Sequence, residues 1–405
     1  MQNRHVLISG AGVSGQALAY WLVRHGFRPT VVERTVGPRR GGQGVDVRDQ
    51  AIDVAERMGI LQRLRAVATH AVGLQFVDAD DRAIARIDVQ NAQQRNGGGN
   101  VEVMRADLVR ILHDITSGTV EYRFDDAVRA VAQDPDGVTV DFVRGARRRF
   151  DLVVGADGLH SAIRRLAFGP EDAFVHHMGC YVAFGTADAA LGRDRWTTAF
   201  NVPGRMAAIY RPGGDAQAMA YFLFRSPRLD LDHHDPVAVR SALAAAFGDV
   251  HAWRVPELLA GALADPELYF DSLSRVRMDS WSTGRVVLAG DAAHCASPAS
   301  GAGTELALIG AYRLAGELAV ARGDHRLAFP RYEQAHRPLV HRKQQVGPNL
   351  LRLTVPKTRL GMAVRNTVIR LPLLESLAGL ERLMAPRTIT PLPGYRPDGG
   401  ETRGA

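Results

Sequence analysis

The chain contains three short glycine-containing motifs, and each follows a run of apolar, mostly β-branched residues. They are Gly10-Ala-Gly12-Val-Ser-Gly15, Gly155-Ala-Asp157-Gly158 and Gly290-Asp291-Ala-Ala-His294. The runs that precede them are Val6-Leu-Ile8, Leu152-Val-Val154 and Val286-Val-Leu288, which is typical of buried strands. Glycine turns let the backbone approach phosphates and sugars closely. Three turns at the carboxyl ends of strands therefore indicate one long dinucleotide laid across a single sheet.

The first motif has the spacing of a dinucleotide fingerprint, with a tight turn, a close approach to pyrophosphate and close helix–strand packing. Glu33 follows eighteen residues after Gly15, at the end of the next expected strand, where a carboxylate binds ribose hydroxyls. A 2′-phosphate would be repelled there, so FAD or NAD is favoured over NADP in this site. We expect the adenosine half of the cofactor to contact Gly10, Gly12, Val13, Ser14, Gly15, Glu33 and Arg34.

The elements that must position these residues can be read from periodicity. Apolar spacing predicts helices over Val13–His25, Gln50–Met58 and Arg105–Ile115. Two-residue alternation predicts antiparallel strands between Ala71 and Val103, around the Asp134-Pro-Asp-Gly137 turn, and again from Tyr181 to Phe224. Residues 97–99 read as a loop tip.

The order of these elements predicts an α/β fold: a Rossmann-like FAD-binding domain with an inserted antiparallel-sheet domain and C-terminal helices. We assign residues 1–70, 101–170 and 280–330 to the FAD-binding domain and residues 71–100 and 171–279 to a substrate-binding β-sheet domain. Residues 331–395 are predicted to be helices that pack on both domains, and 396–405 to be a tail.

Composition narrows the class of protein. A hydrophobic content of 46% with 23% charged residues is ordinary for a soluble globular chain. Residues 331–405 carry 13 Arg or Lys against 5 Asp or Glu, but these alternate with apolar residues, which favours amphipathic helices over a nucleic-acid or lipid surface. No apolar run reaches the ~20 residues of a membrane span. With only Cys180 and Cys295, and no Cys/His metal spacing, we expect a cytoplasmic protein without metal.

The three motifs together resemble the signatures of the flavin-dependent aromatic hydroxylases related to para-hydroxybenzoate hydroxylase. The similarity is greatest to the single-component FAD monooxygenases of the tetracycline-inactivating and urate-hydroxylating type. It extends to about Tyr395 and includes Arg105 at the start of an Arg-Ala-Asp-Leu helix. The chain departs from the family at Gly301-Ala302-Gly303-Thr304, where Gly-Gln-Gly followed by Asn is more common.

The resemblance implies roles for further residues. Asp291 would bind the ribityl chain, and Arg105 would contact the flavin and its phosphates; the less favoured alternative for Arg105 is a surface residue at a helix start. Asp157 would serve the cofactor, or cap the next helix, or both. Arg164 would contact passing NADPH or NADH. The residues Pro298, Gly301, Gly303 and Thr304 would begin a long helix whose amides face the pyrimidine end of the flavin.

Two further groups are candidates for contact with the flavin or substrate. Asp46 and Arg48 lie in a segment that in relatives passes near the flavin ring, although a simple salt bridge between them is equally compatible with the sequence. Aromatic residues of the second alternating block could line a substrate pocket or belong to the core; they are Tyr181, Tyr210, Phe222 and Phe224.

The expected function is that of a monooxygenase using FAD, NADPH or NADH, and O2 to hydroxylate an aromatic or polycyclic small molecule. In such enzymes hydride reduces the flavin, oxygen adds at C4a, and the hydroperoxide transfers oxygen to the substrate. The role would lie in secondary metabolism or antibiotic inactivation, and the protein would be a monomer or homodimer. The alternatives are a non-oxygenating flavoprotein of the same fold (a reductase or halogenase) and a ligand-sequestering protein without turnover. The Trp-x-Trp-x-Ile-Pro signature of flavin halogenases is absent.

Overall fold

A mostly parallel sheet carries all three glycine motifs. The computed structural model describes residues 3–37, 42–88, 99–188, 190–213, 217–232, 235–370, 391–395 and 401–402. The strand order is β17-β18-β11-β1-β2-β7, and only β17 runs antiparallel to its neighbour. The strands are β1 (His5–Ser9), β2 (Arg28–Val32), β7 (Glu121–Arg123), β11 (Leu152–Gly155), β17 (Ser282–Thr283) and β18 (Val286–Leu288). The buried apolar runs of β1, β11 and β18 are adjacent, so their glycine turns leave the sheet at the same edge.

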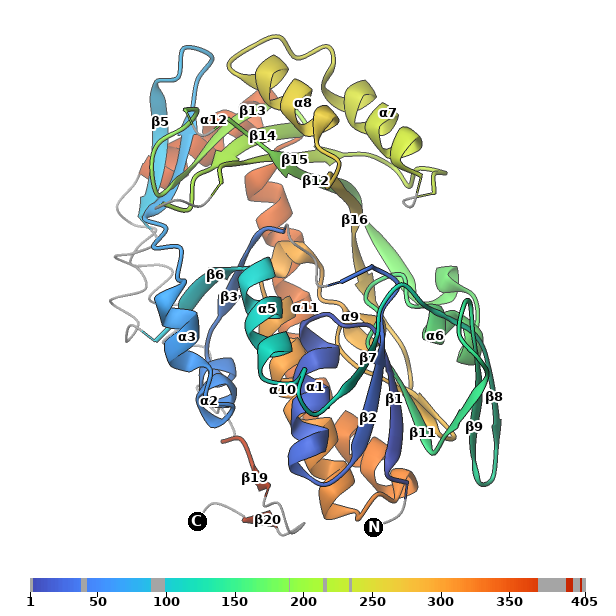
Figure 1. Cartoon of the computed structure of the whole chain (residues 1–405). Coiled ribbons are helices and arrows are strands. Elements are labelled where there is room, and N and C mark those ends of the chain that lie inside the picture. The colour runs from blue at the N-terminus through green and yellow to red at the C-terminus, as the bar shows by residue number, and fades with distance from the viewer. Residues whose placement is uncertain are drawn as a thin grey trace.

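Helices cover one face of this sheet, and a small sheet lies on the other side. α1 (Val13–Arg24) packs against α5 (Arg105–Asp114) and α10 (Gly303–Val320), as Figure 1 shows. The small antiparallel sheet consists of β8 (Val128–Asp134), β9 (Gly137–Phe142) and β10 (Arg148–Phe150). α6 (Ala162–Ala167) follows the second glycine motif and α9 (Asp291–His294) follows the third.

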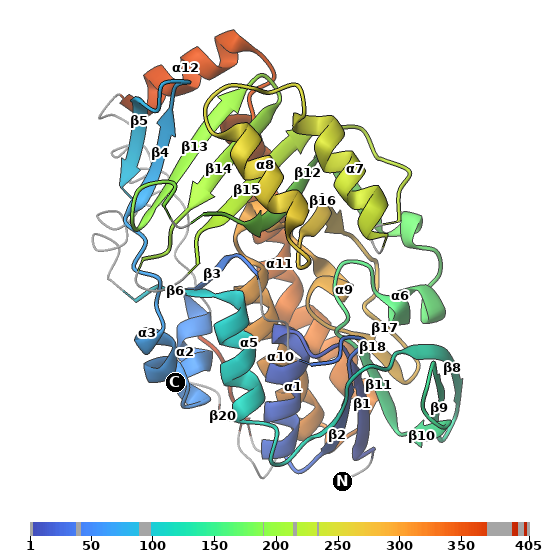
Figure 2. The ribbon, with the colours of Figure 1, turned by 45° about the horizontal axis from the view of Figure 1, so that its top comes forward.

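A seven-stranded sheet forms the other half of the molecule (Figure 2). Its order is β16-β12-β15-β14-β13-β4-β5, and only the β13–β4 pairing is parallel. The strands are β4 (Gly73–Val77), β5 (Ala83–Asp88), β12 (Val175–Thr186), β13 (Trp196–Val202), β14 (Arg205–Tyr210), β15 (Met219–Arg225) and β16 (Tyr269–Val276). Helices α7 (Pro236–Phe247) and α8 (Val255–Ala264) cover one face through an aromatic and aliphatic core. Neither helix, nor β16, was predicted from the sequence.

Three connections hold the two halves together. The long strands β12 and β16 pair from the seven-stranded sheet down to Val175 and Val276, with an irregularity between His177 and Tyr181. The ribbon of β3 (Gly44–Val47) and β6 (Val101–Met104) lies between the halves and leads into α2 (Gln50–Arg57) and α3 (Leu61–Ala66). The third connection is α11 (His325–Thr354), whose end accepts hydrogen bonds from Arg225 at the carbonyls of Leu351 and Val355.

The C-terminal segment is helical over much of its described length. α12 (Arg359–Arg370) follows α11 and lies against β5, while the predicted helical residues 371–390 fall outside the described residues. Within the predicted tail, β20 (Glu401–Thr402) pairs with β19 (Gly394–Tyr395). Among the described helices, none is both long and apolar enough to cross a membrane. Cys180 and Cys295 are buried free thiols.

Arg365 anchors α12 to the seven-stranded sheet. Its side chain is 4% exposed, lies 3.8 Å from the ring centroid of Phe76, and donates to Asn201 Oδ1 at 2.8 Å. Arg365→Ala should lower the free energy of unfolding by about 2–4 kcal/mol, because a charged hydrogen bond and a cation–π contact are lost together. Urea unfolding measures this loss. Arg359→Ala, at an exposed position of the same helix, is the control, and equal effects of the two substitutions would contradict the anchoring role.

Candidate functional site

The three glycine turns meet at one edge of the parallel sheet. Gly10 has a positive φ of 105°, and a Cβ there would lie 2.5 Å from the carbonyl oxygen of Ala156 in the second turn. Gly290 has a φ of 61°, and a Cβ there would lie 2.9 Å from Ser14 Oγ in the first turn. Side chains are excluded at both contacts, so glycine is required for the turns to converge.

The first turn forms a cradle in front of a helix. α1 begins at Val13, directly after Gly12, and a Cβ on Gly12 would meet no atom within 4 Å. A Cβ on Gly15 would instead collide with the carbonyl of Gly10. The Ser14 hydroxyl is buried and has no hydrogen-bond partner among the described residues. Open space at Gly12, a free hydroxyl and the amides of a 12-residue helix fit the pyrophosphate of a dinucleotide.

Glu33 lies beside this cradle. One carboxylate oxygen accepts a hydrogen bond from the amide of Ala11 at 2.8 Å, and the other accepts from the amide of Thr35 at 3.1 Å. The carboxylate therefore ties the end of β2 to the first glycine turn. Arg34 follows it at an exposed position. These contacts fit the predicted position of the adenosine ribose.

Asp157 in the second turn shapes the start of α6. Its carboxylate accepts hydrogen bonds from the amide of Ile163 at 3.1 Å and from Ser9 Oγ at 3.3 Å, and also from Ser161 Oγ. Burial raises the pKa of Asp157, while these hydrogen bonds oppose the rise. Asp157 thus accepts from one amide of the first turn of α6, while the N-cap itself is Ser161, whose hydroxyl accepts from the amide of Arg164.

Arg164 does not face a surface where a nucleotide could dock. Its side chain is fully buried, and its guanidinium donates to the carbonyls of Ala292 at 2.9 Å and Leu159 at 2.5 Å. The guanidinium thus joins the second and third turns. This position does not favour the predicted contact with NADPH or NADH, because in the structure the guanidinium holds the turns together.

The third turn presents Asp291 and the start of α10. Asp291 is the first residue of α9 and is an exposed residue; loss of solvation of its carboxyl among the surrounding protein atoms raises its pKa, opposed by the positive charge of Arg105. Arg105 is the first residue of α5, so the two charges face each other from different elements. Pro298–Ser300 form a short 3₁₀ turn, Gly301 is left-handed, and α10 begins at Gly303 with Thr304 buried behind it.

Asp46 and Arg48 lie against the Gly301 turn. Arg48 Nη1 is 3.9 Å from Asp46 Oδ2, and Arg48 Nη2 donates to the carbonyl of Ser300 at 3.3 Å. A Cβ on Gly301 would lie 4.0 Å from Asp46 Oδ2. The structure therefore contains the long salt bridge and also places both side chains beside the start of α10.

Glu102 is a site residue that the sequence did not reveal. It lies opposite Asp46 in the β3–β6 ribbon and accepts hydrogen bonds from Tyr210 at 2.9 Å and Thr69 at 3.0 Å. Burial raises the pKa of Glu102, and the neighbouring Asp46 raises it further. Burial also raises the pKa of Asp46, against the opposing effect of Arg48. Two carboxyl groups thus share one partly enclosed region.

A second missed feature is the pairing of a buried carboxylate with one of the chain's two lysines. Glu305 in the first turn of α10 is 2.6 Å from Lys343 Nζ and 3.5 Å from Arg48 Nε. Lys343, on α11, also contacts Asp49 at 3.2 Å. The scarcity of lysine was a signal available in the sequence, whereas the partners of Lys343 depend on the tertiary structure.

Of the two alternatives for the four aromatic residues, pocket or core, three of them take the core position. Tyr181, Phe222 and Phe224 pack under α7 and α8, on the face of the sheet that is turned away from the glycine turns. Tyr210 faces the ribbon instead, stacked on Tyr221 with ring centroids 5.7 Å apart. Because neighbouring strand residues alternate between faces, Tyr221 rather than Phe222 shares the face with Tyr210. The described residues contain no His, Cys, Asp or Glu group that could hold a metal ion.

Comparison with known proteins defines the class. The family model described as "FAD binding domain" matches residues 3–220 and 264–342, so the chain belongs to this family. These matched residues contain all three glycine turns, and the family accounts for FAD as the dinucleotide that they bind. The predicted fold class is confirmed.

Individual relatives are similar over most of their length. A flavin-dependent monooxygenase of Legionella longbeachae is 36% identical over 346 residues, which cover 85% of this chain and 88% of that protein. An uncharacterized protein of Mycobacterium tuberculosis is 42% identical, covering 84% of this chain and 91% of the relative. The crystal structure of tetracycline destructase Tet(51) superposes with a TM-score of 0.81 at 33% identity, covering 91% of this chain and 96% of that one. The predicted membership in the flavin-dependent monooxygenases is confirmed.

Gly12→Val should abolish FAD binding and leave the fold intact. The valine side chain would occupy the open space where the pyrophosphate is expected. It would not disturb the fold, because a Cβ at position 12 meets no protein atom within 4 Å. The ratio of bound flavin to protein after desalting, together with circular dichroism, measures both effects. Gly118→Val, at an exposed glycine that also has no atom within 4 Å, is the matched control. Full flavin occupancy in Gly12→Val would show that this turn does not hold the pyrophosphate.

Arg164→Met should destabilise the protein by about 2–4 kcal/mol, because the carbonyls of Ala292 and Leu159 lose a charged donor. The KM for the nicotinamide nucleotide should stay unchanged in the folded fraction. Arg165→Met, at an exposed neighbour, should cost less than about 1 kcal/mol. A raised KM with normal stability would instead restore the nucleotide-binding role of Arg164.

Proposed function

We propose that this protein is an FAD-dependent monooxygenase that uses NADPH or NADH and O2 to hydroxylate an aromatic or polycyclic small molecule. The observation that carries the proposal is the position of the β3–β6 ribbon. Its Asp46 lies beside the start of α10, and its Glu102 bonds to Tyr210 of the seven-stranded sheet. A flavin held by the glycine turns and a substrate held under the sheet would meet at this ribbon.

The residues that would hold FAD lie along one line of turns. Gly12, Ser14 and the start of α1 would take the pyrophosphate, and Glu33 the adenosine ribose. Asp291 and Arg105 would take the ribityl chain and nearby phosphate oxygens, with the amides at the start of α10 beyond them. When bound, the flavin supplies the redox chemistry, accepting hydride and activating oxygen. The side chains supply binding, orientation and exclusion of water.

Tyr210 and Tyr221 support an aromatic substrate. Both rings lie on the face of the sheet above the ribbon, with their centroids 5.7 Å apart, and the Tyr210 hydroxyl donates to Glu102 of β6 at 2.9 Å. Burial raises the pKa values of both phenols, so they remain neutral donors. A planar ligand can pack against the half-buried Tyr221 ring, while Tyr210, which is 3% exposed, stacks on Tyr221 within the protein. The name of the similar Tet(51) structure, a tetracycline destructase, makes a polycyclic substrate a reasonable first candidate.

The nicotinamide nucleotide is proposed as a transient co-substrate. The chain has one complete dinucleotide fingerprint, and we assign it to FAD. NADPH or NADH would then dock without a Rossmann domain of its own. Flavin reduction should therefore be faster when the aromatic substrate is present.

Product analysis separates this function from its alternatives. The FAD-loaded protein is incubated with NADPH or NADH and an aromatic library, and oxygen uptake, hydrogen peroxide and product mass are measured. A product heavier by one oxygen atom, labelled from 18O2, supports the monooxygenase. Nucleotide oxidation that yields only peroxide with every compound would indicate a reductase. Tight binding of a compound without nucleotide oxidation would indicate a sequestering protein.

Asp46 is predicted to support oxygen transfer in its ionised form. Because its pKa is raised, the carboxylate forms only at a higher pH than for an ordinary aspartate, so activity should fall as the pH decreases through that raised pKa. Asp46→Asn should still bind FAD. Its activity should no longer fall as the pH decreases through this range, and it should release more hydrogen peroxide per nucleotide oxidised. Glu102→Gln tests the coupled partner, and Asp53→Asn, at an exposed site on α2, is the control. Unchanged coupling and an unchanged pH profile in Asp46→Asn would leave this residue with only its salt bridge to Arg48.

A further inference from the structure

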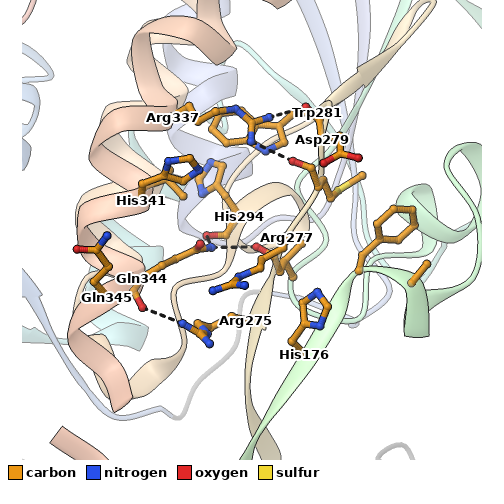
Figure 3. A pocket seen from close by; sticks show the side chains of 15 residues that line it. His176, Arg275, Arg277, Asp279, Trp281, His294, Arg337, His341, Gln344 and Gln345 are labelled. Carbon is orange, nitrogen blue, oxygen red and sulfur yellow. Dashed lines mark hydrogen bonds between the residues drawn. The ribbon is translucent and has the colours of Figure 1, made fainter. Parts of the chain in front are cut away.

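An open cavity of about 540 Å³ lies between α11 and the lower ends of β12 and β16. Its α11 side carries Arg337, His341 and Gln344, and its other side carries His176, Arg275 and Arg277 (Figure 3). The Gln344 side chain closes the floor by donating to the carbonyl of Val276 at 2.9 Å. Of the glycine-motif residues only His294, at the end of the third motif, lines this cavity, and none of the ribbon or tyrosine residues assigned above does.

The charge of the cavity wall is strongly positive. Asp279 is the one carboxylate among the lining residues, against three arginines and two exposed histidines. His176 and Arg275 are direct cross-strand partners in the β12–β16 pairing, and Arg277 follows two residues later. Cationic side chains on one face of a strand pair repel each other when both are charged. An anion between them would relieve that repulsion.

The three arginines differ in how many of their guanidinium N–H groups are hydrogen-bonded within the protein. Arg337 is held in place and its charge is matched: it lies over the Trp281 ring at 4.8 Å, donates to the carbonyls of Met278 and Asp279, and forms an ion pair with Glu333. Arg275 donates to the carbonyl of Gln344 at 3.2 Å, but its Nε is buried without a partner among the described residues. The Arg277 guanidinium has no hydrogen bond or ion pair to any described residue. Two guanidinium groups therefore have donors available for a ligand.

We propose that this cavity binds a phosphate or pyrophosphate group, either free or carried by a nucleotide. Arg275 and Arg277 offer planar donor pairs that match phosphate oxygens, with His176 and His341 at the rim. Trp281 offers no stacking face, because it is 2% exposed and lies under Arg337, so the half-buried Phe174 is the remaining phenyl or indole ring of the lining. Recognition is thus of the anion. The cavity volume is ample for a pyrophosphate and is within the range of small-molecule sites.

Pyrophosphate is the probe, used on FAD-loaded protein so that the glycine turns are already filled. Isothermal titration should detect saturable binding, and pyrophosphate should raise the Tm beyond the effect of sulfate at equal ionic strength. Arg277→Glu should weaken binding by about tenfold or more, since it removes a charged donor and adds a repelling charge. Arg275→Gln should weaken binding as well. Arg331→Glu, the same charge change at an exposed site of α11 that does not line the cavity, should bind like the parent.

Nucleotide competition identifies the source of the phosphate. If pyrophosphate raises the apparent KM for NADPH or NADH in the parent and not in Arg277→Glu, the occupant is the coenzyme. If pyrophosphate binds to the parent but does not change its apparent KM for NADPH or for NADH, the occupant is a separate phosphate compound. Absence of saturable binding, or equal binding to the parent, Arg277→Glu and Arg331→Glu, would overturn the proposal. Because binding is measured without turnover, this result is independent of whether the protein proves to be a monooxygenase.

Discussion

The close approach of three backbone turns is the constraint on which the rest of the structure depends. Gly10 touches the second turn and Gly290 touches the first, at distances that no side chain would permit. Parallel pairing of β1, β11 and β18 brings the turns to one edge of the sheet. The buried Arg164 side chain connects the second and third turns by donating hydrogen bonds to their backbone carbonyls. The result is a row of amides, a free Ser14 hydroxyl and the Asp291 carboxylate that fits one extended dinucleotide.

Charge pairs link the segment that contains β3 to α10 and α11. Arg48 bridges Asp46 and the buried Glu305, and Lys343 connects Glu305 to Asp49. Burying such groups costs solvation, so they are weak evidence for stability; removing one partner would leave an uncompensated charge. Their effect is to fix the position of the β3–β6 ribbon relative to α10. The proposed reaction requires a fixed relation between flavin and substrate.

Two questions about side-chain roles, the aromatic pocket and the Arg164 contact, could not be decided from the sequence for the same physical reason: a sequence does not identify the neighbours of a side chain. Period-two alternation correctly indicated strands at Met206–Tyr210 and Met219–Phe224, but the covered face depended on α7 and α8, which come later in the chain. Phe222 therefore packs under the helices while Tyr221 faces the ribbon. Arg164 had the right motif context for a nucleotide contact, yet the turns enclose it completely.

The sequence by itself determined the local features: the three strand–glycine-turn units, the helix after Gly15, the acid at Glu33 and the long helix that begins at Gly303. Each depends on residues close together in the chain, where sterics and hydrogen bonding act directly. Only the tertiary structure decided that Glu102 lies opposite Asp46, that Lys343 pairs with Glu305, and that α11 closes a cationic cavity over β16. These contacts join residues far apart in sequence, and their pairing is set by how sheets and helices pack rather than by any local pattern.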